Sequence, residues 1–232
     1  MTSMADPVYV FDLDETVLTI NSFPRWVTFL ATGRARSLSL PRRLMMAGAT
    51  AAALAERKLF KAPHARFKGK LQGIWKWGAG QAGAEALDGF TQAMLAHRRD
   101  NLQDLVSQAA NGRIDAILAT AAVEEYAAPL AQRLGFAQWI ATPAGAATGG
   151  ENVGARKRET VLERMQMLGW QERPIYLLTD HRDDIPLVGV SERVAWFGSN
   201  EEMARIASDH PSRFLAARTA PASAIAGFFA AP

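Results

Sequence analysis

Apolar residues recur along this chain in short runs of the length typical of buried β-strands. The runs span residues 8–11, 114–119, 139–141, 175–178 and 194–197. Beyond Arg113 they alternate with two stretches, 123–136 and 156–170, in which apolar residues return every three or four positions, as on one face of a helix. Each stretch ends in Leu-Gly before an aromatic residue, a typical helix terminus. This alternation predicts an α/β fold, with a Rossmann-like parallel sheet covered by helices on both faces.

Between the first and second runs the chain lacks strand-like alternation and favours helices. Helical patterns cover residues 23–30 and 44–60, and a longer apolar stripe follows them. The stripe passes through Leu87, Phe90, Met94, Leu102 and Leu105 and ends at Asn111-Gly112. We expect a Gly-rich stretch, residues 69–83, to interrupt these helices. The pattern therefore predicts an α/β catalytic core of residues 1–18 and 113–232 and a helical cap of residues 19–112.

The net charge of +3 conceals two segments of opposite sign. Residues 25–99 hold 14 Lys and Arg against 3 Asp and Glu, whereas the rest of the chain holds 12 basic and 20 acidic residues. The basic residues are spread over helices without a recognisable nucleic-acid-binding module, so we expect no nucleic acid partner. The absence of cysteine excludes disulfides, a thiolate nucleophile and cysteine zinc sites.

Two features bear on localisation. The apolar run at 44–55 is shorter than the roughly 20 residues that a helix needs to span a bilayer, so we expect a buried or surface-lying helix there. The N-terminal residues lack the basic and apolar segments of a secretory signal. These features favour a cytoplasmic protein, with peripheral contact at the inner face of the membrane as a further expectation.

Carboxylates follow directly after the first apolar run, in the sequence VYVFDLDET. Asp12 and Asp14 lie at the end of a core strand, where a charge costs free energy unless it is compensated. Thr120 and Asp180 end two later runs, and Lys157 begins a helix between them. The carboxyl ends of neighbouring parallel strands form one crevice, which would collect these side chains. Clustered carboxylates favour a hard cation, and Mg²⁺ commonly takes one or two carboxylates together with a substrate phosphate.

In this order the motifs resemble those of the haloacid dehalogenase-like hydrolase superfamily. DLDET is similar to its DxDxT motif, and ILAT, which ends at Thr120, to its second motif. NVGARK, which contains Lys157, is similar to the third, and TDHRDDIPLV, with Asp180 and Asp184, to the acidic fourth. The helical segment after the first motif resembles the cap of the phosphoserine-phosphatase-like branch. Four motifs in order are far more specific than a DxD pair alone.

This resemblance implies a phosphatase and a role for each matching residue. Asp12 would be the nucleophile that forms an aspartyl-phosphate, and Asp14 the general acid and base. Asp14 favours phosphoryl chemistry, because relatives that cleave carbon–halogen bonds lack this second acid. Thr120 and Lys157 would bind phosphate oxygens as charge develops in the transition state. The Mg²⁺ ligands would be Asp12, Asp14 through its backbone carbonyl, Asp180 and Asp184.

Simpler structural roles remain open for several of these residues. Thr120 alone could be the N-cap of the following helix, and the lysine of the Arg-Lys-Arg run could be solvated. Asp183 could be a turn residue, or it could replace Asp184 as a metal ligand, although the spacing to Pro186 favours Asp184. Glu15 departs from the family pattern, which commonly has glycine at this position.

The basic cap bears on the substrate. Residues 16–55 contain no Asp or Glu, and their arginines are Arg25, Arg34, Arg36, Arg42 and Arg43. Relatives that accept phosphoserine generally offer a carboxylate near the cap entrance, where this chain has Asn21, so we do not expect phosphoserine as the substrate. The cap suits an acidic phosphate, and Arg25 is its predicted substrate-binding residue. The segment after DLDET is also loosely similar to bacterial phosphatidylglycerophosphate phosphatases, which implies a lipid-linked substrate.

A phospholipid headgroup as substrate would bring the cap to an anionic membrane. The run at 44–55, its flanking arginines, Trp75 and Trp77 would then lie on the bilayer, with the tryptophans at headgroup level. Tight helix packing inside the cap explains the same alanine-rich pattern. The leading hypothesis is a Mg²⁺-dependent phosphomonoester hydrolase. The alternatives are a cytosolic small-metabolite phosphatase of the phosphoserine-phosphatase type and a non-catalytic domain that binds anionic membranes.

Overall fold

The computed structural model of this chain describes residues 6–80, 83–145 and 150–231. Within these residues one sheet of six parallel strands has the order β3-β2-β1-β4-β5-β6. The strands are β1 (Val8–Phe11), β2 (Asp115–Val123), β3 (Trp139–Thr142), β4 (Ile175–Thr179), β5 (Arg193–Trp196) and β6 (Arg213–Ala216). In the register of the central strand, Val8 is opposite Asp115 of β2 and Ile175 of β4. The predicted parallel α/β sheet is confirmed.

Helices cover both faces of the sheet, which explains why β1 is apolar at every position. Tyr9 and Phe11 belong to one core cluster and Val8 and Val10 to the other, as the alternation of side chains along a strand requires. The first cluster includes residues of α6 (Gln103–Ala110), α7 (Glu124–Leu134) and α11 (Ala222–Ala230). The second includes residues of α8 (Ala155–Met167), α9 (Ile185–Val188) and α10 (Asn200–Asp209).

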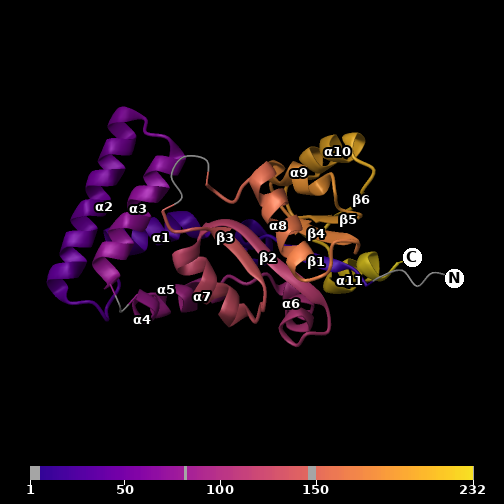
Figure 1. Ribbon diagram of the computed structural model, residues 1–232, viewed down its shortest axis with the longest axis horizontal. Coiled ribbons are helices and arrows are strands. Elements are labelled where there is room, and N and C mark those ends of the chain that lie inside the picture. The colour runs from indigo at the N-terminus through magenta and orange to yellow at the C-terminus, as the bar shows by residue number, and fades with distance from the viewer. Residues whose placement is uncertain (1–5, 81–82, 146–149, 232) are drawn as a thin grey trace.

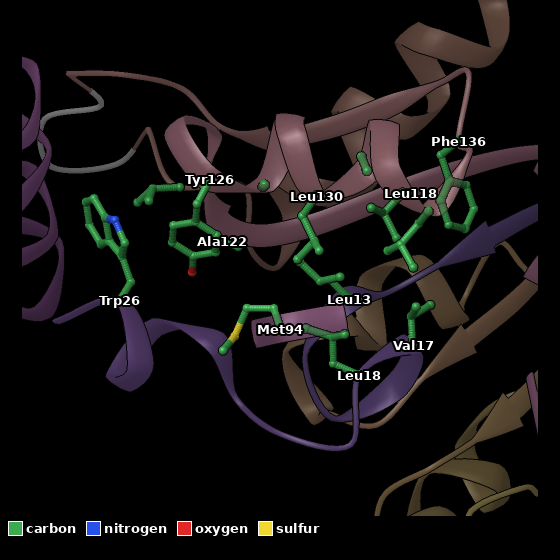
Figure 2. Close-up of a cluster of buried hydrophobic side chains, with 14 of the residues drawn as sticks. Leu13, Val17, Leu18, Trp26, Met94, Leu118, Ala122, Tyr126, Leu130 and Phe136 are labelled. Carbon is green, nitrogen blue, oxygen red and sulfur yellow. The ribbon is translucent and has the colours of Figure 1, made fainter. Parts of the chain in front are cut away.

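A group of helices stands beside the sheet, at the left of Figure 1. They are α1 (Ser22–Ala31), α2 (Leu40–Phe60), α3 (His64–Ala79), α4 (Gly83–Ala86) and α5 (Asp88–Leu95). Figure 2 shows side chains of this group, Trp26 and Met94, in one buried cluster with Tyr126 and Leu130 of α7. The rings of Trp26 and Tyr126 lie 5.4 Å apart between centroids. The helices therefore share the hydrophobic core of one sheet face.

Two chain segments connect these helices to the sheet, and they pair with each other. Leu18 and Arg98 form an antiparallel bridge, and the amide of Thr19 donates to the carbonyl of His97 at 2.8 Å. The 3₁₀ turn that follows, Asp100–Leu102, belongs with the sheet, because the side-chain amide of Asn101 donates to the carbonyls of Ala217 and Ala220. We therefore propose that the cap comprises residues 19–97, shorter than the predicted 19–112, and the name is used in this sense below.

The structure refines two expectations about the cap. The Gly-rich stretch does interrupt the helices, but only near its end: α3 runs through three of its glycines and ends at Ala79, with Gly80 as its C-cap. Residues 81–82 of that stretch lie outside the described part. Gly78 allows α2 and α3 to approach closely, since a Cβ there would lie 2.2 Å from the Met46 sulfur. The long apolar stripe is divided between two helices: α5 ends at Leu95, where the chain turns to pair with the outgoing segment, and α6 begins at Gln103.

The sequence pattern did not identify β6. Its four residues are only partly buried and include an arginine, so they lack the continuous apolar run that marks the central strands. β6 forms one end of the strand order, beside β5. It does not contribute to the site described next.

Candidate active site

The carboxyl ends of β1, β2 and β4 open into one cavity of about 440 Å³. Because these strands are adjacent and parallel, the residues that follow them meet at one edge of the sheet. The cavity is lined by predicted site residues from four motifs, namely Asp12, Asp14, Thr120, Lys157, Asp180 and Asp184. The predicted convergence of these residues is therefore observed.

The loop after β1 turns sharply just beyond Asp12. Glu15 adopts a left-handed backbone conformation, with φ of 55°. Glycine reaches this region without steric cost, which gives a physical reason for glycine at this position in the family. Arg99 supports the strained turn from the cap connection: its guanidinium donates to the carbonyls of Glu15 at 2.6 Å and Thr16 at 2.7 Å.

Lys157 lies between two carboxylates at the centre of the site. Its Nζ is 2.6 Å from Asp12 Oδ1 and 2.8 Å from Asp184 Oδ2. Thr179, the last residue of β4, also donates its hydroxyl to Asp184 Oδ2 at 2.5 Å. Burial opposes the positive charge, but Asp12 and Asp184 outweigh it and raise the pKa of Lys157 above its usual value. The lysine therefore remains charged in a buried position.

Asp14 points to the start of the cap rather than to Lys157. Its Oδ1 accepts a hydrogen bond from the backbone amide of Ser22 at 2.8 Å, and the Ser22 hydroxyl contacts the Tyr126 hydroxyl at 3.0 Å. Burial raises the pKa of Asp14 to about 6, although the contact with Ser22 opposes the rise. A carboxyl group with this pKa can hold or release a proton near neutral pH, as a general acid and base must.

The site carries more negative charge than its lysine neutralises. Burial raises the pKa of Asp12 to about 7, with Lys157 opposing the rise and Asp184 adding to it. Burial and repulsion from Asp12, Glu15 and Asp184 raise the pKa of Asp180 to about 8. In the described residues no three acidic or histidine side chains are arranged to hold a metal by themselves. Mg²⁺ commonly takes only one or two carboxylates and completes its shell with water and substrate phosphate, so the paired acids of this cavity suit the ion without a third.

Asp183 and Asp184 differ sharply in position. Asp184 is 4% exposed and faces Lys157, whereas Asp183 is exposed and lies 3.4 Å from the His181 ring nitrogen. The geometry therefore favours Asp184 at the centre of the site. Asp183 reaches only the rim of the cavity.

Thr120 lies inside β2 and is buried, so it does not cap the following helix; the residue before that helix is Val123. The Thr120 hydroxyl accepts a hydrogen bond from the backbone amide of Ala122 at 3.0 Å. Asn152, which the sequence analysis did not single out, donates its side-chain amide to the Thr120 carbonyl at 2.9 Å. Its position in the NVGARK motif, near Lys157, is the sequence feature from which Asn152 could have been identified.

The structure does not bring Arg25 to this site. Arg25 is exposed and lines another cavity, of about 790 Å³, together with Arg34 and Arg36. Trp26, the next residue of α1, is instead fully buried in the core. The prediction of Arg25 as a substrate contact therefore finds no support in the observed arrangement.

A different cap residue, Lys68 of α3, reaches the cavity. It is 5% exposed, its Nζ lies 2.5 Å from Glu151 Oε1, and it donates to the carbonyl of Ala121 at 2.9 Å. Lys68 is also close enough to oppose the rise in the pKa of Asp14. Neither Lys68 nor Glu151 belongs to a motif, so no local pattern distinguished them. Glu151 comes from the core, and Lys68 already engages its carboxylate.

The model of the haloacid dehalogenase-like hydrolase family matches residues 9–188. No curated protein matches the sequence at a significant level. Among solved structures, a protein of unknown function from Bordetella pertussis Tohama I is similar, with a TM-score of 0.69 at 16% identity. That alignment covers 92% of this chain and 99% of the other.

Phosphoserine phosphatases also have this fold. A probable phosphoserine phosphatase from Vibrio cholerae gives a TM-score of 0.60 at 11% identity and covers 96% of this chain and 64% of its own. A phospho-aspartyl intermediate analogue of phosphoserine phosphatase gives 0.58 at 10% identity and covers 96% and 98%. At such identities the likeness establishes the fold. Because the family match spans all four motifs, this chain belongs to the haloacid dehalogenase-like hydrolase family, as predicted.

Proposed function

We propose that this protein is a Mg²⁺-dependent phosphomonoester hydrolase that works through an aspartyl-phosphate on Asp12. The observation that carries the proposal is the contact between Lys157 and both Asp12 and Asp184, inside a cavity that Asp14, Thr120 and Asp180 also line. A non-catalytic scaffold has no physical reason to keep these buried charges together, because each one costs free energy to desolvate.

In the first half of the reaction, a carboxylate oxygen of Asp12 attacks the phosphorus of the ester. The bond between phosphorus and the alcohol oxygen breaks, and protonated Asp14 gives its proton to the departing oxygen. In the second half, Asp14 takes a proton from water, and the resulting hydroxide attacks the aspartyl-phosphate. The products are the alcohol and inorganic phosphate, with Asp12 and Asp14 restored.

Two polar groups would steady the phosphoryl group during both halves. The ammonium of Lys157, held next to Asp12 Oδ1, is placed to meet the charge on the phosphoryl oxygens. Thr120 offers a hydroxyl from the end region of the adjacent strand. Both side chains are buried, so water screens these interactions little.

Mg²⁺ would be held by Asp12 and Asp180, the backbone carbonyl of Asp14 and, directly or through water, Asp184. The ion, when bound, would polarise the phosphoryl group and neutralise its charge. The raised pKa of Asp180 supports this assignment, because a cation would offset both of its causes, burial of the carboxylate and repulsion from the neighbouring acids.

The substrate we propose is an acidic phosphate, and a lipid-linked one is the more specific form. The cavity wall nearest the cap carries Lys68, which meets Glu151 at 2.5 Å. An anionic leaving group could share or replace that contact, whereas a free amine would find the carboxylate already paired. A small soluble metabolite is the second candidate, since the cavity volume suits either a headgroup or a free metabolite.

Hydrolysis of an aryl phosphate by Asp12→Asn, with and without Mg²⁺, tests the mechanism. We expect a loss of several powers of ten, because the variant removes the nucleophile. Asp183→Asn is the matched control: it alters an exposed acid at the rim of the same cavity and should retain most of the activity. Comparable turnover by Asp12→Asn and the wild type would refute the proposal.

A further inference from the structure

The outer face of α2 is apolar along its length. The helix turns Met46, Thr50 and Ala53 inward. Its opposite side exposes Leu44 (63%) and Leu59 (74%), with small residues between them at Gly48, Ala51, Ala52 and Ala55. A helix on a water-facing surface normally carries charged or polar residues on its outer side, so α2 has the pattern of a helix covered on both sides.

The apolar surface extends beyond this one helix face. Leu40, Met45 and Phe60 are exposed towards the ends of α2, and Trp77 of α3 is 58% exposed. Trp77 lines a hollow of about 510 Å³ together with Ala49 and Ala52 of α2. Trp75, expected on the same surface, is instead buried in the cap, so that part of the expectation was wrong. In Figure 1, α2 is the outermost element of the cap, so this surface faces away from the sheet.

The two helices that form the apolar surface are strongly basic. Over residues 40–80, all described, the chain has nine Lys and Arg and one acid, Glu56. Glu56 is half-buried, and it is paired with Lys70 and, at 3.6 Å, with Arg66. The remaining exposed cations are Arg42, Lys58, Lys61 and Lys76. The partner of this surface must therefore be apolar and negatively charged.

We propose that the outer face of α2, with Trp77 of α3, docks on the surface of an anionic lipid bilayer. An apolar face with a basic rim and a tryptophan at its edge fits the boundary between headgroups and acyl chains. A second copy of this chain fits poorly, because a symmetric contact through this face would oppose like charges. In the described residues no helix is long and apolar enough to cross a membrane, so α2 would lie along the surface.

The same helix links this surface to the cavity. Lys68 and Trp77 both belong to α3, nine residues apart, which corresponds to roughly 14 Å along a helix axis. Docking would thus hold the cap at the membrane while Lys68 stays at the cavity. That this placement would serve a lipid-linked substrate rests on the proposed function. The docking surface itself does not depend on it.

Sedimentation of the full chain with vesicles tests the proposal. The probes are vesicles of phosphatidylcholine alone and vesicles that also contain phosphatidylglycerol, at low and high salt. We expect binding to the anionic vesicles only, weakened by salt. The double variant Leu44→Glu/Leu59→Glu should bind at least ~10-fold more weakly, because two side chains lose their burial and gain repulsion. Met167→Glu is the matched control, since Met167 is equally exposed (71%) but lies on α8 of the core.

Three results would overturn the proposal. One is equal or negligible binding to both kinds of vesicle. Another is an equal loss of binding in Met167→Glu and the double variant. The third is a wild-type dimer in solution that the double variant converts to a monomer, which would assign the face to a second copy. Hydrolysis of a soluble aryl phosphate by the double variant should match the wild type, and this readout separates failure of docking from failure of the proposed enzyme.

Discussion

The ammonium of Lys157 lies 2.6 Å from Asp12 Oδ1, although 145 positions separate the two residues. Both side chains are buried, and Asp184 contacts the same ammonium from the other side at 2.8 Å. One cation thus compensates two buried carboxylates, and the arrangement tolerates little change. Removal of the cation would leave two negative charges in a poorly solvated position.

Lys157→Met should therefore lower stability as well as activity. We expect a loss of about 3–5 kcal/mol in the free energy of unfolding near neutral pH, measured by urea denaturation. Hydrolysis of an aryl phosphate should fall by several powers of ten. Arg156→Met, one residue earlier on an exposed pair with Glu159, should change stability by less than about 1 kcal/mol. Equal effects of the two substitutions would contradict this account of Lys157.

Asp14→Asn should stabilise the fold while it abolishes turnover. Burial raises the pKa of Asp14 from 3.8 to about 6, so the ionised carboxylate destabilises the folded state increasingly between about pH 4 and pH 6. Above that range the penalty is constant, and we expect the neutral variant to gain about 3 kcal/mol at pH 7.5. At pH 4 the two proteins should be nearly equal. Unfolding by urea at both pH values provides the measurement, and a gain that is larger at pH 4 would exclude this explanation.

Mg²⁺ should raise the thermal midpoint of the wild type, because a ligand that binds only the folded state stabilises it. Asp180→Asn should lose this response, since the assigned site loses a carboxylate. Asp183→Asn should keep it, because that side chain is exposed and lies near His181. Thermal unfolding with increasing Mg²⁺ distinguishes the variants, and NaCl at equal ionic strength controls for screening. A response lost in Asp183→Asn and kept in Asp180→Asn would reverse the assignment.

Gly78→Ala should destabilise the cap. A Cβ at Gly78 would lie 2.2 Å from the sulfur and 2.3 Å from the Cγ of buried Met46, so α2 and α3 must separate or Met46 must repack. We expect a cost of about 1–3 kcal/mol. Gly73→Ala on the same helix meets nothing within 4 Å and should gain up to about 1 kcal/mol from helix propensity. Chemical denaturation of both variants tests the contrast, which similar shifts would disprove.

Much of the core and its site could be predicted from local pattern. Four consecutive apolar residues marked β1, and helical periodicity marked α7 and α8. Parallel strand–helix connections bring the carboxyl ends of all strands to one edge. Asp12, Thr120 and Asp180 therefore converge as soon as their strands are neighbours, and the order of the motifs supplied Lys157.

The cap could be predicted less well than the core. Its contacts join different helices, whereas a local pattern repeats along a single helix. Gly78 belongs to the Gly-rich stretch, yet it lies inside α3, at a position where Met46 of α2 leaves no room for a side chain. Arg25 had the charge of a substrate contact, but its place on α1 turns it to another cavity. Lys68 had no distinguishing neighbour in sequence and reaches the site through Glu151, more than eighty positions away.

Local pattern was enough to show which faces are apolar, where the central strands end and which acids follow them. Three features needed the packed fold: the contact of Asp184 rather than Asp183 with Lys157, the approach of Lys68 rather than Arg25 to the cavity, and the uncovered apolar face of α2. Hydrophobic periodicity identifies one helix or strand at a time, and chain order gives only the direction in which each one runs. The pairing of polar side chains across elements depends on how the cap packs on the core, and no local pattern encodes those distances.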